Sequence, residues 1–259
     1  MAAAGNPDGE TNPPRTDPIR SLQLLWGIRT LPKRGPKPGL TVDVIVGAAI
    51  EIADVDGLVG LSMRRVADRL GVGTMSLYRY VPAKAELVDL MFDRVCSETA
   101  RPDDVAGGWR GRLEQIAREN LALYEGHPWL LELTTIRPPL GPGVIAKYDF
   151  ELRAIDGVGL SDVAMDSVLS LLLGYVQSAA ALRAVWMRVP EETGQTDDEW
   201  WLSIAPTLEQ VLDVERYAVA VRVGTAATDE YRGLHDPGYA FEFGLERVLD
   251  GVAVLIESK

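Results

Sequence analysis

The stretch from Ser62 to Lys84 carries the residues whose types and spacing favour binding to a polyanion. It holds five Lys or Arg residues and one acid, Asp68. Basic side chains pair with phosphate groups, and short polar side chains such as Thr74 and Ser76 can hydrogen-bond to base edges. The chemistry that this stretch favours is recognition of double-stranded DNA.

Catalytic and metal-binding residues are scarce by comparison. Cys96 is the one cysteine, which excludes a disulfide framework, a four-thiolate zinc site and an iron–sulfur cluster. Two distant histidines, His127 and His235, leave little for zinc or for histidine-based catalysis. The chain lacks a nucleophile elbow, a phosphate-cradling glycine loop and spaced metal ligands. We therefore expect no cofactor, no metal and no enzymatic activity, and we expect Cys96 to be at least half-buried.

Charge is distributed unevenly along the 259 residues, whose formal net charge is −12. Residues 19–40 contain five basic residues and no acid, whereas residues 96–259 contain 14 basic and 27 acidic residues, a net −13. A polyanion would be attracted to the first third and repelled by the remainder. This asymmetry predicts a nucleic-acid-binding end joined to a separate acidic module.

The expected location is the cytoplasm. A single cysteine favours a reducing compartment, and residues 1–18 lack the apolar core of a secretory signal. No apolar run approaches the ~20 residues that span a bilayer, so we expect no membrane partner.

The elements that position the basic residues read as helices throughout, which predicts an all-α fold. Thr41 is a good N-cap, and apolar residues then recur at helical spacing until Gly57. Further helical patterns cover residues 62–70, 74–81, 84–95, 109–124, 144–157, 161–188, 200–223 and 237–257.

Residues 62–81 have the pattern of a helix–turn–helix. Two helices that cross steeply need a small residue at their contact, here Ala67, and a glycine where the first helix ends left-handed, here Gly71. The second helix should be short and capped by Thr74, with Leu77 and Val81 anchoring it from below. Its outer face then remains available to the major groove.

These residues resemble a known family. Residues 41–95 are similar to the DNA-binding domain of TetR family repressors, above all in Thr74-Met-Ser-Leu-Tyr-Arg-Tyr-Val81 followed by Lys84-Ala-Glu-Leu87. The C-terminal part resembles the tetracycline-repressor-like ligand-binding domain through Gly126-His-Pro-Trp129 and Arg137-Pro-Pro-Leu-Gly-Pro142. Leu24-Leu-Trp-Gly27 with Arg34-Gly-Pro-Lys37 is similar to actinobacterial members that carry an N-terminal extension.

The resemblance implies three parts: a flexible basic extension over residues 1–40, a helix–turn–helix domain over 41–95, and a helical ligand-binding and dimerisation domain over 96–259. It further implies a homodimeric repressor that binds a palindromic operator and is released by a small hydrophobic or aromatic effector. The alternative is a DNA-binding activator or global regulator without a small-molecule ligand.

The DNA-binding candidates surround the recognition helix and the basic extension. We expect the opening of the helix to read bases, Arg79 to meet guanine or phosphate, and Tyr80 and Lys84 to meet phosphates. For Arg64 and Arg65 the alternative is a solvated basic face, and for Arg79 it is an ion pair on the helix surface. The basic segment 29–37 either lies in the minor groove as an extended arm or is a solvated tail without a fixed site. The candidates are Arg64, Arg65, Gly73, Thr74, Met75, Ser76, Tyr78, Arg79, Tyr80 and Lys84, with Arg29, Lys33, Arg34 and Lys37 of the extension.

The C-terminal part offers two further sets, and the alternative for both is the intramolecular core. The ligand-binding candidates are Trp129, Met165, Tyr175, Gln177, Trp186 and Met187. By resemblance, the dimer-interface candidates are Leu171, Leu172, Gly174, Phe241, Leu245, Val248, Leu249 and Val252. We expect His127 to act at a helix end as a cap and His235 to lie in a turn before the last helix.

Overall fold

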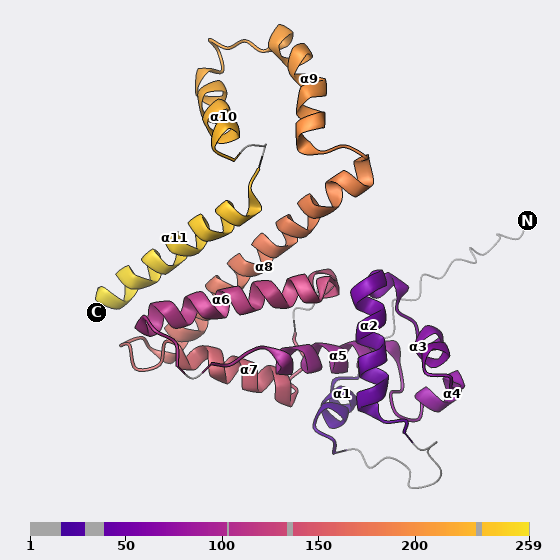
Figure 1. Ribbon diagram of the computed structural model, residues 1–259. Helices are drawn as coiled ribbons and strands as arrows, with labels where there is room; N and C mark the ends of the chain where they lie inside the picture. The colour runs from indigo at the N-terminus through magenta and orange to yellow at the C-terminus, as the bar shows by residue number, and fades with distance from the viewer. Residues whose placement is uncertain (1–16, 29–38, 103, 134–136, 232–234, 259) are drawn as a thin grey trace, which may run out of the picture. The chain divides into compact units, whose positions relative to one another are not determined.

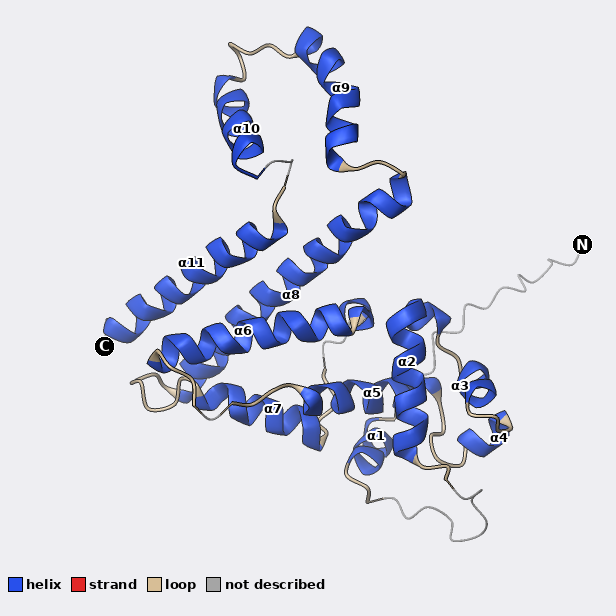
Figure 2. Cartoon of the chain, viewed as in Figure 1, coloured by secondary structure: helices blue, strands red, loops and turns tan. Residues whose placement is uncertain are grey.

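The computed structural model describes residues 17–28, 39–102, 104–133, 137–231 and 235–258. Within these ranges all regular structure is helical and none is strand (Figures 1 and 2), which confirms the predicted all-α fold. The elements are α1 (Pro18–Leu25), α2 (Val42–Gly60), α3 (Met63–Arg69), α4 (Thr74–Leu77), α5 (Lys84–Glu98), α6 (Gly108–Gly126), the 3-10 helix η1 (Pro128–Glu132), α7 (Pro142–Arg153), α8 (Asp162–Thr193), α9 (Asp197–Val211), α10 (Ala218–Tyr231) and α11 (Pro237–Glu257).

The chain folds into two compact units. The first unit consists of residues 1–102 and 126–151, and the second of residues 103–125 and 152–259. The segment 41–95, expected to bind DNA, lies wholly in the first unit. That unit also takes in η1 and most of α7, which follow α6 in the chain.

Local signals place α2 and α3 as the sequence predicts. The Thr41 hydroxyl accepts a hydrogen bond from Val44 N at 3.2 Å, and the Ser62 hydroxyl accepts one from Arg65 N at 3.2 Å. Each satisfies a backbone amide that has no partner within its helix. Gly57 (φ 65°) breaks α2 before its last turn, and Gly71 (φ 64°) follows α3 in the left-handed conformation.

The second helix of the helix–turn–helix, the recognition helix, is shorter than the helix predicted over residues 74–81. The α-helix α4 ends at Leu77, and the amides of Tyr80 and Val81 both donate to the Leu77 carbonyl in the turn that follows, at 2.8 and 2.9 Å. Gly73 is the N-cap and no side chain caps the helix, so the prediction that Thr74 caps it is wrong. Thr74 is instead the first helical residue.

The core of the first unit lies beneath α4. Leu77 and Val81 are fully buried, as predicted, and Ala67 of α3 is fully buried as well. They share this core with residues of α2 and α5, among them Ile45 and Met91. The short α4 is therefore held by apolar anchors on one side and presents its other side to solvent.

Helix α1 lies within the segment expected to be a flexible extension. Asp17 caps it, Pro18 is its first residue, and it packs against α5. The buried hydroxyl of Ser21 donates to Asp89 Oδ2 at 2.6 Å. The part of the extension that the structure describes, residues 17–28, thus belongs to the first unit.

In the second unit α8 and α11 run antiparallel, side by side (Figure 1). Their contact buries Leu172 and Leu245. Gly244 permits the close approach, since a Cβ there would lie 2.3 Å from the Tyr175 hydroxyl. Helix α6 joins α11 through Arg118, whose Nη2 lies 2.7 Å from Glu242 Oε2.

Between α8 and α11 the chain forms two helices rather than the one predicted over residues 200–223. Helices α9 and α10 are separated by residues 212–217, and neither contains a buried residue. Their exposed apolar side chains include Leu202 (73%) and Val219 (67%).

Helix α8 is long and apolar enough to cross a membrane by length and composition alone, contrary to the expectation that no apolar run approaches that length. A core helix of a soluble protein meets the same criterion. Because α8 packs along α11, we interpret it as a packing helix of the second unit.

Candidate nucleic-acid interface and ligand pocket

The exposed face of α4 gathers the residues predicted to read bases. Met75 is 75% exposed, and Thr74 and Ser76 beside it are half-buried. Tyr78 and Arg79 are exposed just after the helix, and Tyr80 is half-buried. A protruding segment with one thioether and two hydroxyls can contact thymine methyl groups and base-edge hydrogen-bonding groups.

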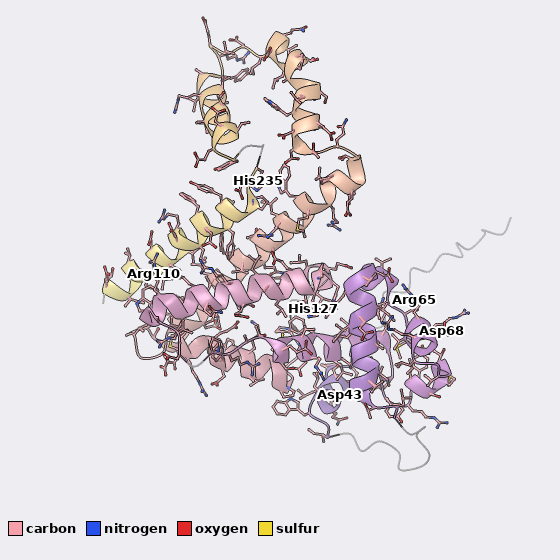
Figure 3. All side chains as sticks on the ribbon, in the orientation of Figure 1. Asp43, Arg65, Asp68, Arg110, His127 and His235 are labelled. Atoms are coloured by element: carbon pink, nitrogen blue, oxygen red, sulfur yellow. The ribbon has the colours of Figure 1, made fainter. Side chains whose placement is uncertain are left out.

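The two arginines of α3 have different surroundings. The Arg64 side chain is 86% exposed, and among the described residues its ion pair is a long one, 3.8 Å from Nε to Oδ2 of Asp68, which Figure 3 labels. Arg65, also labelled there, donates from Nη2 to Asp56 and from Nη1 to the Gly60 carbonyl at 2.7 Å. Arg64 is thus available to DNA, whereas Arg65 connects α3 to the end of α2.

Lys84 opens α5 and also has a structural contact. Its Nζ donates to the Leu58 carbonyl at 2.7 Å, at the last turn of α2. An ammonium group has three donors, so it can hold this carbonyl and a phosphate together. Ala83, the N-cap of α5, provides no side-chain cap, and the first amides of α5 are suited to a phosphate.

These residues come from α3, from α4 and the residues on either side of it, and from the start of α5, all within the first unit. The basic residues of the extension, Arg29, Lys33, Arg34 and Lys37, lie outside the described residues.

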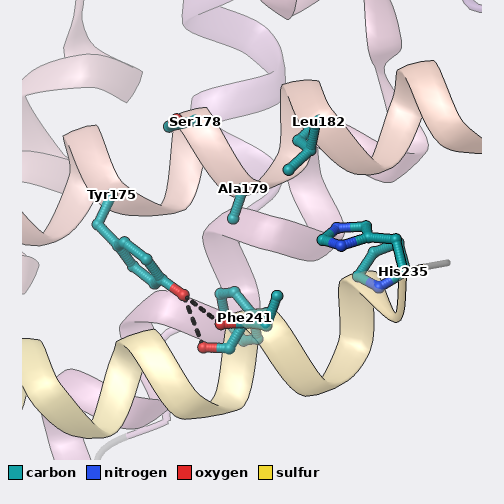
Figure 4. A pocket seen from close by; sticks show the side chains of 8 residues that line it. Tyr175, Ser178, Ala179, Leu182, His235 and Phe241 are labelled. Carbon is teal, nitrogen blue, oxygen red and sulfur yellow. Dashed lines mark hydrogen bonds between the residues drawn. The ribbon is translucent and has the colours of Figure 1, made fainter. Parts of the chain in front are cut away.

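A cavity of about 160 Å³ lies between α8 and α11 in the second unit (Figure 4). The Tyr175 hydroxyl at one end hydrogen-bonds to the carbonyls of Ala240 and Phe241, at 3.1 and 2.8 Å. Burial, with a smaller effect of Glu242, raises the pKa of Tyr175, so this hydroxyl remains protonated at neutral pH. The lining residues are Tyr175, Ser178, Ala179, Leu182, His235, Pro237, Ala240 and Phe241.

His235 gives the cavity a polar group. Its ring stacks on Trp186 with centroids 5.1 Å apart, and its Nε2 is buried with no hydrogen-bond partner among the described residues. A buried polar atom without a partner is costly, and a ligand with a complementary group would satisfy it. His235 lies just before α11, as predicted, but its place in a cavity was not foreseen.

The predicted ligand-binding residues do not form one cluster. Tyr175 lines the cavity and Trp186 contacts it through His235, whereas Met165 is buried in α8, and Gln177 and Met187 are exposed. Trp129 belongs to the first unit. The remaining lining residues were missed because they lie on α8 and α11, far apart in sequence.

Most of the predicted dimer-interface residues are buried within the chain itself. Leu171 and Gly174 of α8 are exposed, and Val248 of α11 is half-buried. The others are buried within the second unit, which supports the alternative of an intramolecular core for Leu172, Phe241, Leu245, Leu249 and Val252.

Metal-binding and nucleophilic groups are not clustered. In the ranges that the structure describes, no group of three or more His, Cys, Asp or Glu side chains could hold a metal ion. Cys96 is buried, as predicted, and burial raises the pKa of its thiol to about 12. The thiol is therefore protonated and a poor nucleophile at neutral pH.

Two family models match the chain. The model described as bacterial regulatory proteins, tetR family, matches residues 45–91, which contain α3 and α4. The model described as tetracyclin repressor-like, C-terminal domain, matches residues 101–256.

Individual proteins show the same likeness over nearly the whole chain. HTH-type transcriptional repressor DrrR1 of Streptomyces coeruleorubidus is 47% identical over 244 residues, covering 94% of this chain and 88% of that protein. HTH-type transcriptional repressor Rv1353c of Mycobacterium tuberculosis is 28% identical, covering 91% and 88%. ActR of Streptomyces coelicolor, solved in complex with actinorhodin, matches with a TM-score of 0.70 and 28% identity, covering 84% of this chain and 97% of that one.

Proposed function

This chain belongs to the TetR family of bacterial regulators and is a transcriptional repressor with a helix–turn–helix DNA-binding domain, and we propose that it binds a palindromic operator as a homodimer and is released by a small hydrophobic or aromatic effector. The observation that carries the proposal is the short α4, which buries Leu77 and exposes Met75, with Arg79 exposed just after the helix. The second unit, residues 103–125 and 152–259, contains 11 basic and 23 acidic residues, a net −12, so DNA contact falls to the first unit.

In this proposal α4 enters the major groove with its N-terminal residues toward the bases. Met75 contacts thymine methyl groups, and Thr74 and Ser76 hydrogen-bond to base edges. Gly73, which has no side chain, allows the backbone before α4 to approach the DNA closely. Arg64, Tyr78, Arg79, Tyr80 and Lys84 surround the helix and contact phosphates, with Arg79 also in reach of guanine.

A homodimer accounts for the apolar surface that one chain leaves uncovered. Helices α9 and α10 contain no buried residue, and Leu171 of α8 is 57% exposed beside the exposed Gly174. Helices of 15 and 14 residues are marginal unless an apolar face is packed. A second copy of the chain covers these faces and presents two α4 helices to half-sites roughly 34–36 Å apart.

The α8–α11 cavity is the proposed effector site. Its wall of Leu182, Ala179 and Phe241 suits an aromatic group, and the unpartnered Nε2 of His235 suits a polar substituent on that group. ActR, which is similar to this chain, was solved with actinorhodin, which supports a small-molecule effector. The repressor acts where the chromosome is, in the bacterial cytoplasm.

The basic segment between α1 and α2 is proposed as an additional minor-groove contact. Its flanking residues Ile28 and Gly39 belong to the first unit, the unit that carries α4. Because α1 packs on α5, deleting the extension would disturb the fold. Replacing Arg29, Lys33, Arg34 and Lys37 together with Gln is the cleaner test, and it should weaken operator binding and lower its salt dependence.

The central experiment measures binding of the full chain to fluorescent duplexes from the DNA that flanks its own gene. A random duplex of the same length is the control. We expect one duplex to bind with at least ~10³-fold preference at physiological salt. Actinorhodin and a panel of aromatic compounds are then added to the complex, and release of the duplex is measured.

The outcomes separate the alternatives. A monomer that ignores every duplex at low ionic strength would overturn the proposal as a whole. Specific binding that no compound weakens, with no compound shifting the melting temperature, would favour a regulator without a small-molecule ligand.

A further inference from the structure

A cluster of hydrogen bonds connects η1 to α2 within the first unit. Asp54 of α2 is its centre, because one oxygen, Oδ1, lies 2.7 Å from His127 Nδ1 and 2.8 Å from Trp129 Nε1. An ionised carboxylate only accepts, so His127 donates from Nδ1 and Trp129 from Nε1. The Trp129 ring is fully buried, so its indole N–H cannot turn to solvent instead. His127 is the N-cap residue of η1, as expected, but its side chain makes no cap hydrogen bond and binds Asp54 instead.

A second carboxylate extends the cluster across the break in α2. Gly57 lies against Glu132 of η1 so closely that a Cβ there would be 2.7 Å from Oε1. The next amide, Leu58 N, donates to Glu132 Oε2 at 3.2 Å. Position 57 favours glycine for two reasons, the positive φ of the backbone there and this close approach of Glu132.

The turn after the break, residues 58–60, is held from three directions. Glu132 of η1 accepts from its first amide, Lys84 of α5 donates to the Leu58 carbonyl at 2.7 Å, and Arg65 of α3 donates to the Gly60 carbonyl at 2.7 Å. This turn leads directly into α3 and then α4. Its direction therefore sets how the helix–turn–helix is oriented on α2.

We propose that residues 127–132, the η1 brace, set the orientation of α3 and α4 and so control operator affinity, a step that rests on the proposed function. Asp54 and Glu132 are positioning residues in this scheme, and neither needs to touch DNA. When the brace is released, the turn 58–60 samples more directions and the fraction of molecules competent to bind DNA falls. Apparent affinity falls with that fraction.

The test uses the full-length protein without any effector. Trp129→Phe removes the indole donor and leaves a smaller aromatic ring, Glu132→Ala removes the acceptor for Leu58, and Glu132→Gln keeps an oxygen there. Asp43→Asn is the matched control, because Asp43 is an 81% exposed acid on the same helix that pairs with Arg94 and does not touch η1. Affinity for the flanking duplex, its salt dependence, and hydrogen exchange of free protein over residues 58–81 are measured.

We expect Trp129→Phe and Glu132→Ala each to weaken operator binding about tenfold and to speed exchange over residues 58–81. The salt dependence should stay as in the wild type, because no phosphate contact is removed. Glu132→Gln should recover most of the lost affinity, and Asp43→Asn should change neither measurement.

The proposal is overturned if Trp129→Phe and Glu132→Ala bind like the wild type, or if exchange accelerates evenly over both units, since that would mean general destabilisation. Should Glu132→Ala not fold, the operator affinity and hydrogen exchange of Trp129→Phe and Glu132→Gln still test the proposal. If the wild type bound no duplex, the proposed function would fall, while exchange over residues 58–81 would still decide on the brace.

Discussion

The indole N–H of Trp26 donates a hydrogen bond to the carbonyl oxygen of Leu140 at 2.8 Å, across 114 residues of sequence. Trp26 follows α1 directly, and Leu140 lies just before α7, within the first unit. Because Ser21 of α1 also bonds to Asp89 of α5, the short helix connects α5 with the turn that leads into α7.

Removing the Trp26 hydrogen bond should lower stability modestly. Trp26→Phe keeps an aromatic ring but loses the donor, and we expect the free energy of unfolding to fall by about 1 kcal/mol. Urea unfolding of the full chain measures this change. Ile19→Ala, at a 68% exposed position on α1, is the control and should change the free energy of unfolding very little. A Trp26→Phe protein as stable as the wild type would show that this bond contributes nothing.

The helix–turn–helix was predictable from local signals. Thr41 and Ser62 cap their helices, Gly71 is left-handed, and Leu77 and Val81 are buried, each as the residue type and spacing indicate. These features depend on neighbours within a few residues, which a sequence pattern records. The same holds for the last helix, α11, whose predicted bounds match.

Features that depend on distant residues were not predictable. An eight-residue helix such as α1 is marginal alone and forms because α5 lies against it. The bond between His127 and Asp54 spans 73 residues, and nothing local to His127 indicates it. The cavity between α8 and α11 depends on helices that meet only in the folded chain.

Replacing Asp89 should stabilise the protein at neutral pH. Burial raises the pKa of the Asp89 carboxyl, an effect that the Ser21 hydrogen bond opposes and Glu86 reinforces. A carboxyl with a raised folded pKa holds its proton more tightly in the folded state, so the free energy of unfolding falls as pH rises from 3.8 through that raised pKa. At pH 7 the folded state therefore bears the full cost of burying the ionised Asp89 carboxylate.

Asp89→Asn removes this penalty and leaves an oxygen to accept from Ser21. We expect a higher melting temperature at pH 7 and a gain that shrinks as the pH is lowered toward 3.8. Thermal unfolding across this range is the measurement, with the exposed Asp43→Asn as the control. A gain that is equal at every pH would mean that ionisation of Asp89 is not its cause.

Substitutions on and beside α4 should separate base reading from phosphate binding. Met75→Ala removes an exposed apolar group at the start of α4, so it should change base preference at one position by about 1–3 kcal/mol. Tyr80→Phe should weaken binding to all duplexes alike, because a phosphate contact carries no sequence information. Selection from a randomised duplex pool, with affinities at several salt concentrations, measures both.

The two variants control for each other, since both alter side chains of the same segment. If both lowered only the melting temperature and left DNA binding intact, the proposed orientation of α4 in the groove would be wrong.

Acidic substitutions on α9 or α10 should weaken the dimer. Leu202 and Val219 are apolar and 73% and 67% exposed, on helices without a buried residue. If a second copy covers them, Leu202→Glu or Val219→Glu places an unpaired charge in an apolar contact, and we expect the dimer dissociation constant to rise at least tenfold. Sedimentation velocity at several protein concentrations measures it.

Loss of the dimer should carry two further consequences. Helices α9 and α10 are marginal without a partner, so helicity measured by circular dichroism should fall with dissociation. Operator affinity should fall too, because one subunit holds one half-site. Val55→Glu, at an 82% exposed apolar position in the first unit, introduces the same charge and should leave the oligomeric state unchanged. Variants at Leu202 and Val219 that remain dimeric would place the interface elsewhere and leave the exposed faces of α9 and α10 to another partner.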